Sequence, residues 1–131
     1  MRLLLDTHVA LWAIADDRRL PAQARVLISD PENEVLVSVA SVWEIAIKHA
    51  LGGGRSGGMP ISGSAALGYF RAAGYAVLEI AAAHVLAVEH LPALHADPFD
   101  RLLAAQAASV PLRLITHDPV VGRYSDQIIV V

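Results

Sequence analysis

The sequence predicts an α/β fold in which helices cover both faces of a mostly parallel central sheet of four or five strands. Four short apolar runs, at residues 3–5, 35–37, 76–79 and 112–115, are typical of buried strands, and a fifth at 128–131 is expected at an edge. Helical patterns separate these runs, and strands that alternate with helices favour parallel pairing. Residues 1–131 fit one domain, because the chain contains neither a repeat nor an interdomain linker.

The first two helices follow from apolar spacing and from residues that begin or end helices. Val9 and Trp12 lie on one face of a helix that follows the first strand and ends at the acidic turn of residues 16–17. Pro21 suits the first turn of a second helix that runs to about Ser29, because its missing N–H is not needed there.

The later helices are marked by capping signals. A third helix is expected at residues 41–51, with Ser41 as its cap and Glu44 three residues later, as in a capping box. Further helices are expected at 62–73, 81–89 and 98–110, and Asp97 with Pro98 opens the last of them. The glycine-rich stretch 52–60 is expected to be a flexible loop between two helices of the one domain.

Composition excludes several classes of protein. The chain has no cysteine, which rules out a disulfide framework and a Cys-based zinc site. No apolar run approaches the roughly 18 residues of a membrane helix, and Asp6 interrupts an N-terminal stretch too short for a signal peptide. We therefore expect a cytoplasmic protein. The net charge of -3 is unlike that of most nucleic-acid binders, so any affinity for RNA must come from metal ions and local arginines.

Five of the 13 acidic residues stand out by their position. Asp6 and Asp118 follow predicted strands, and Glu44 lies in a helix that is apolar nearly all round. Asp97 and Asp100 lie at a helix start. Each has an ordinary alternative: the aspartates can be N-caps, and Glu44 can pair with a lysine one turn later.

Together these residues indicate more than capping. In open parallel sheets the carboxyl ends of the strands form the ligand crevice, and the helices that carry Glu44 and Asp100 would enter from that side. Four carboxylates in one place repel one another unless a cation neutralises them. An all-oxygen ligand set suits Mg²⁺ or Mn²⁺.

Four segments resemble the acidic motifs of PIN-domain nucleases, and the VapC-type toxins are the most similar branch. Such similarity covers almost the whole chain, in order and at compatible spacing. The segments are Leu4-Leu5-Asp6-Thr7-His8, Ser41-Val42-Trp43-Glu44-Ile45-Ala46-Ile47-Lys48, Asp97-Pro98-Phe99-Asp100-Arg101-Leu102-Leu103-Ala104-Ala105-Gln106-Ala107 and Ile115-Thr116-His117-Asp118.

The resemblance implies a Rossmann-like three-layer PIN fold, a divalent metal and endoribonuclease activity. It also implies dimerisation and a cognate antitoxin. Asp6, Glu44, Asp100 and Asp118 match the catalytic acidic set, and we expect Asp6, Asp100 and Asp118 to bind Mg²⁺ or Mn²⁺. Asp97, as an N-cap, and Thr116, as the hydroxyl residue before the last aspartate, are expected to support these ligands. We expect no organic cofactor.

Three other functions agree less well with the sequence. A haloacid-dehalogenase-like phosphatase would have Asp-x-Asp after the first strand, whereas Asp6-Thr7-His8 lacks the second aspartate. A nucleotide-binding module would have a glycine-rich phosphate loop after a strand, and the glycines at 52–58 follow a helix. A non-catalytic scaffold would have lost acidic residues, and all four acidic positions are filled.

Several conspicuous residues are expected to lie outside the site. His90 and His95 lack a recognised metal-ligand spacing. Arg101 is expected to pair with Asp97, one helical turn away. Trp43, like Trp12, is expected in the core. The high hydrophobic fraction of 55% favours a surface covered by a partner or a second copy.

Overall fold

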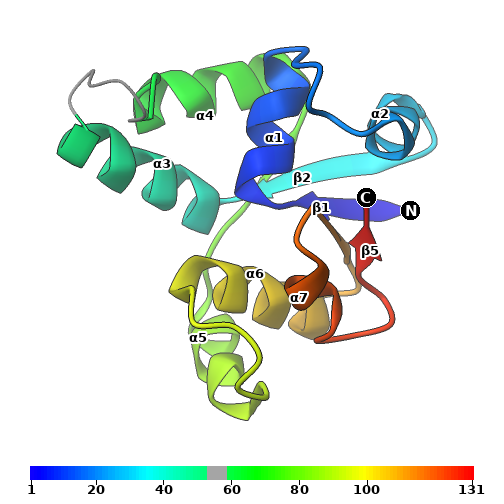
Figure 1. Ribbon diagram of the computed structural model, residues 1–131, viewed down its shortest axis with the longest axis vertical. Helices are drawn as coiled ribbons and strands as arrows, with labels where there is room; N and C mark the ends of the chain where they lie inside the picture. Colours follow the sequence, from blue (N-terminus) through cyan, green and yellow to red (C-terminus); the bar gives the residue numbers. More distant parts are fainter. Residues whose placement is uncertain (53–58) are drawn as a thin grey trace.

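Strands and helices alternate along the chain in the computed structural model, which describes residues 1–52 and 59–131 (Figure 1). Most of the loop expected at 52–60 lies outside the described residues. The strands are β1 (Arg2–Leu5), β2 (Glu34–Ser38), β3 (Ala76–Leu78), β4 (Arg113–Thr116) and β5 (Ile129–Val130). The helices are α1 (Thr7–Ile14), α2 (Ala22–Ser29), α3 (Val39–Gly52), α4 (Gly63–Ala72), α5 (Ala82–Ala87), the 3₁₀ helix η1 (Val88–His90), α6 (Pro98–Ser109) and α7 (Pro119–Gly122).

All five strands pair in parallel, in the order β3-β2-β1-β4-β5. From β1 the chain builds outward through β2 to β3, and then returns to the other side of β1 with β4 and β5. The order therefore reverses between β1 and β4, where Leu5 lies opposite Ile115. In an open α/β sheet such a switch point leaves a crevice at the carboxyl ends of the strands.

Both faces of the sheet are buried, which explains why the strands read as continuous apolar runs. Side chains alternate across the sheet: Leu3 and Leu5 of β1 pack on one face, and Leu4 packs on the other. Helices α1 to α4 cover the first face, α6 and α7 cover the second, and α5 packs against α6 on the side away from the sheet (Figure 1). The expected three-layer α/β fold is confirmed.

The start of α3 differs from the prediction. This helix begins at Val39, directly after β2, so Ser41 lies inside the helix and does not cap it. Instead Ser38, the last residue of β2, accepts a hydrogen bond from the Ala40 amide at 3.0 Å. Ser38 also donates to Gln106 Oε1 at 2.6 Å, which ties the start of α3 to α6.

Two smaller differences concern α2 and an aromatic side chain. Pro21 takes the N-cap position of α2 and is not part of its first turn. Trp43, expected in the core, is 53% exposed on α3, where its ring packs edge-on against Phe99 at a centroid distance of 5.0 Å. Among the helices described, none is both long and apolar enough to cross a membrane.

Helices α3 and α4 approach so closely that one glycine between them has no room for a methyl group. A Cβ on Gly63 would lie 2.9 Å from the Ala46 Cβ and 3.2 Å from the Val42 carbonyl oxygen. Gly68, in the exposed middle of α4, would have nothing within 4 Å of an added Cβ.

We predict opposite effects for the two Gly→Ala substitutions. Gly63→Ala should lower the free energy of unfolding by about 1–3 kcal/mol, because α4 must shift from α3. Gly68→Ala should raise it by about 0.5–1 kcal/mol, since alanine loses less backbone entropy in a helix. Urea unfolding of both variants tests the close contact, and equal effects would show that α4 tolerates the shift.

Candidate active site

Asp6 stands at the switch point, directly after β1. Its Oδ1 accepts a hydrogen bond from the Val9 amide at 2.9 Å and so caps α1, while its Oδ2 accepts one from the Thr116 hydroxyl at 2.6 Å. The Thr116 oxygen in turn accepts a hydrogen bond from the Asp118 amide at 3.1 Å. Thr116 therefore links the aspartates that follow β1 and β4.

The carboxyl group of Asp6 is buried, with 8% of the residue exposed. Burial raises its pKa above the ordinary value, although the hydrogen bonds from Thr116 and Val9 act in the opposite direction. The Asp6 carboxylate is thus fixed by hydrogen bonds from the protein and has little contact with solvent.

Glu44 points inward from α3 and is 4% exposed. Its Oε1 accepts a hydrogen bond from Thr7 Oγ1 at 2.6 Å, and its Oε2 lies 2.5 Å from Lys48 Nζ, one turn along the helix. Ser41 Oγ lies 3.0 Å from the Thr7 oxygen. Thr7 has a single hydroxyl proton, which it donates to Glu44, so the Ser41 hydroxyl is the donor in its contact with Thr7. The ion pair with the lysine one turn later is confirmed, and Thr7, the residue directly after Asp6, links Glu44 to the start of α1.

Asp97 and Asp100 divide the start of α6 between them. Asp97 is the N-cap, and its Oδ1 accepts hydrogen bonds from the amides of Phe99 at 2.9 Å and Asp100 at 3.0 Å. Pro98 occupies the first helical position, as expected. Asp100 has no capping role, so its side chain is free to face the crevice.

Asp100 carries the clearest sign of crowded negative charge. Its pKa is raised to about 6, first by burial and then by the charges of Asp97, Asp6 and Glu44, while His95 acts to lower it. Three of the acidic residues predicted from the sequence, Asp97, Asp6 and Glu44, therefore disfavour the ionisation of Asp100.

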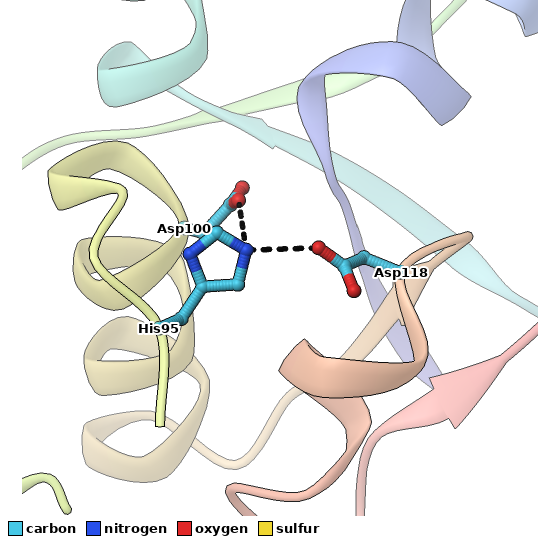
Figure 2. A group of neighbouring side chains, drawn as sticks. All are labelled: His95, Asp100 and Asp118. Atoms are coloured by element: carbon cyan, nitrogen blue, oxygen red, sulfur yellow. Dashed lines mark hydrogen bonds and ion pairs between the residues drawn. The ribbon is translucent and has the colours of Figure 1, made fainter. Parts of the chain in front are cut away.

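The structure adds His95, which sequence analysis had set aside. Its Nε2 lies 2.9 Å from Asp118 Oδ2 and 3.5 Å from Asp100 Oδ2, and these atoms lie within 4.8 Å of one another (Figure 2). His95 reaches the site from the segment just before α6. The one sequence feature that could have indicated His95 is its position two residues before the cap Asp97. In the structure, His95 Nδ1 accepts a hydrogen bond from the Asp97 amide.

Asp118 is the N-cap of α7, with Oδ1 accepting from the Val120 amide at 2.9 Å. Partial burial acts to raise the pKa of Asp118, but the hydrogen bonds from Val120 and His95 outweigh it and lower the pKa. Asp118 is therefore kept ionised more readily than Asp6 or Asp100, whose pKa values are raised.

Arg101 does not pair with Asp97 as expected. Its guanidinium donates instead to the carbonyls of Pro92 at 3.0 Å and Val88 at 3.3 Å, and to the Tyr124 hydroxyl at 3.2 Å. The reason is geometric: the Asp97 carboxylate faces the amides of the helix it caps, so Arg101 anchors the preceding segment.

The arrangement fits a divalent cation. Carboxylate oxygens of Asp100 and Asp118 lie within 4.8 Å of each other and of His95 Nε2, and the charges of Asp6 and Glu44 act on Asp100. Carboxylate oxygens are the donors that Mg²⁺ and Mn²⁺ prefer, and a cation would offset the repulsion that raises the pKa of Asp100.

Comparisons with known proteins agree with this fold. A family model described as PIN domain matches residues 3–126. VapBC2 from Rickettsia felis, solved bound to a DNA fragment from their promoter, has 16% identity and a TM-score of 0.67, covering 100% of this chain and 98% of that chain. DNA-bound VapBC from Salmonella typhimurium has 17% identity and a TM-score of 0.68, covering 100% and 97%.

A third solved structure, VapBC-1 from nontypeable Haemophilus influenzae, has 19% identity and a TM-score of 0.62, covering 100% of this chain and 97% of that chain. No curated protein matches the chain. At these identities the solved structures establish a shared fold over the full length of the chain.

The raised pKa of Asp100 predicts how stability depends on pH without metal. A carboxyl whose pKa rises from 3.8 to about 6 on folding contributes stability that is fully present below about pH 4 and lost as pH rises through 6. Asp100→Asn removes this titration. In EDTA at pH 7 the variant should exceed wild type in unfolding free energy by on the order of 2–3 kcal/mol.

Urea unfolding of wild type and Asp100→Asn between about pH 4 and 7.5 measures the difference. The advantage of the variant should shrink towards zero near pH 4. A wild type at least as stable as the variant throughout would contradict the crowding of charge at Asp100.

Proposed function

Because the chain belongs to the PIN domain family, we propose that it is a divalent-metal-dependent endoribonuclease, the VapC-type toxin of a toxin–antitoxin pair. The observation that carries this proposal is the acidic group at the switch point of the sheet, where Asp100 and Asp118 offer atoms within 4.8 Å of each other and the charges of Asp6 and Glu44 act on Asp100. Nothing in the comparisons favours the haloacid-dehalogenase-like alternative.

In this proposal Asp6, Asp100 and Asp118 hold Mg²⁺ or Mn²⁺, and Glu44 completes the ligand set or orients the attacking water. When bound, the metal supplies an activated water and neutralises charge that develops on the phosphate. Thr116 holds Asp6 and the backbone of Asp118 at a fixed separation, and Asp97 fixes the start of α6, from which Asp100 projects. These contacts position the ligands before substrate arrives.

We further propose a homodimer that acts in the cytoplasm and binds a cognate antitoxin, which covers or enters the acidic site with a basic side chain. Complexes named VapBC among the structural neighbours support the antitoxin partner. An apolar hollow also supports a surface for a partner. It has a volume of about 410 Å³ and lies between α1, α4 and the residues just before α4; its lining includes Leu11, Trp12, Ile14, Met59, Ile61 and Tyr69.

The enzymatic proposal predicts cleavage of RNA with Mg²⁺ or Mn²⁺ and none with excess EDTA. Asp100→Asn and Asp6→Asn should each reduce cleavage by more than about 100-fold. Loss of a residue that only supports a metal ligand typically costs about 10- to 100-fold. Glu32→Gln is the matched control, because it also removes one carboxylate charge. Glu32 is exposed and precedes the amino-terminal end of β2, whereas the site lies at the carboxyl ends of the strands.

Cleavage is followed on labelled RNA, with circular dichroism to check that each variant is folded. A phosphomonoester substrate is assayed beside it. Activity that survives EDTA, or Asp100→Asn as active as Glu32→Gln, would refute the nuclease proposal. Phosphatase activity without RNA cleavage would favour the alternative function.

The partner proposal predicts a dimer at micromolar concentration by light scattering and growth arrest when the chain is expressed alone. Co-expression with the adjacent small open reading frame should relieve the arrest. A strict monomer would contradict the dimer, and unimpaired growth of the native host would contradict the toxin role.

A further inference from the structure

We propose that His95 is a positioning residue of this site: its Nε2–H holds the carboxylate of Asp118 for metal binding, and the imidazole itself is not a ligand. The consequence for metal binding rests on the proposed function. The hydrogen bonding of His95 in the metal-free protein does not.

The backbone sets the tautomer of His95. The Asp97 amide donates to Nδ1 at 3.0 Å, so Nδ1 offers a lone pair and carries no proton. In the neutral ring the proton then lies on Nε2. The Asp97 amide belongs to the N-cap residue of α6, so the tautomer is tied to the start of the helix that bears Asp100.

The proton on Nε2 has an acceptor in place. Nε2 lies 2.9 Å from Asp118 Oδ2, a normal hydrogen-bond distance, and 3.5 Å from Asp100 Oδ2 (Figure 2). The other oxygen of Asp118 accepts from the Val120 amide. Each Asp118 oxygen therefore has one donor that fixes its direction and a remaining lone pair for a cation.

The same network disfavours His95 as a ligand. For Nε2 to bind a cation, the ring proton must move to Nδ1, where it would face the N–H of Asp97. Two donors would then oppose each other, and a half-buried amide would lose its partner. The ring can keep both hydrogen bonds only as a donor to Asp118.

The segment that carries His95 is itself anchored. Arg101 donates to the Pro92 carbonyl at 3.0 Å and lies 3.5 Å from the carbonyl oxygen of His95. The side chain of His95 is 22% exposed and lies between Asp100 at the start of α6 and Asp118 at the start of α7 (Figure 2). A donor fixed in this way orients a metal ligand before the metal binds, and losing such a partner typically weakens metal affinity by about 10- to 100-fold.

Two substitutions separate the two nitrogens. In His95→Asn the side-chain oxygen can accept from the Asp97 amide, as Nδ1 does, but nothing reaches Asp118. In His95→Gln the longer amide can donate to Asp118, as Nε2 does, while the hydrogen bond to Asp97 is lost. A residue that merely supports the segment would tolerate Asn better, and a residue that positions Asp118 would tolerate Gln better.

Titration calorimetry with Mn²⁺ gives the first test. We expect affinity to fall about 10- to 100-fold in His95→Asn and to be restored to within a few-fold of wild type in His95→Gln. Equal losses in both variants, or a loss confined to His95→Gln, would overturn the positioning role.

Nitrogen-resolved NMR of the histidine rings gives the second test, on the metal-free protein and then with Mg²⁺. We expect the proton on Nε2 in both states, and faster exchange of that proton in Asp118→Ala. A proton on Nδ1, or one that moves there when Mg²⁺ is added, would make His95 a ligand and overturn the proposal.

The two tests also keep this inference apart from the proposed function. A wild-type protein that binds no Mn²⁺ and cleaves no RNA would refute the nuclease proposal. The ring spectra of the metal-free protein would still decide whether His95 donates to Asp118.

Discussion

Repulsion between carboxylates at the carboxyl ends of the parallel strands is the constraint on which the surrounding hydrogen bonds depend. Three carboxylates near the switch point are held by neutral donors or a cation: Asp6 by Thr116, Asp118 by Val120 and His95, and Glu44 by Thr7 and Lys48. The remaining repulsion falls on Asp100, whose pKa is raised to about 6. Ligand binding to such a site is coupled to stability, because a bound cation would relieve the repulsion.

The fold could be predicted because strands buried on both faces leave a plain signal in the sequence. The apolar runs at β1, β2 and β4 have no polar face to interrupt them, and the helices between them require parallel pairing. The short helix α7 left no such signal, since four residues are too few to show a periodicity. The start of α3 was misplaced because the chain passes from β2 into the helix at Val39 without a loop, and Ser38, the last residue of the strand, accepts from the Ala40 amide.

The candidate site was predictable where its residues follow strands and unpredictable where it depends on a turn. Asp6 and Asp118 were found because a parallel sheet brings its carboxyl ends together. His95 was missed because it lies in a segment without regular structure, placed by the Asp97 amide and by Arg101. Trp43 was wrongly expected in the core for a related reason. Helix α3 is apolar nearly all round, so its sequence does not indicate which side faces solvent.

In Asp6 and Asp118 the two oxygens of one carboxylate have different partners: one caps a helix and the other faces the candidate site. In Asp6 and Asp118, Oδ1 accepts from the amide of the following helix and Oδ2 faces a neighbour in the site. The helix thus fixes the direction of the oxygen that faces the candidate site. Asparagine can keep the capping oxygen and remove the charge, whereas alanine removes both. Asn variants at these positions therefore report on charge, and Ala variants mix charge with the stability of the helix.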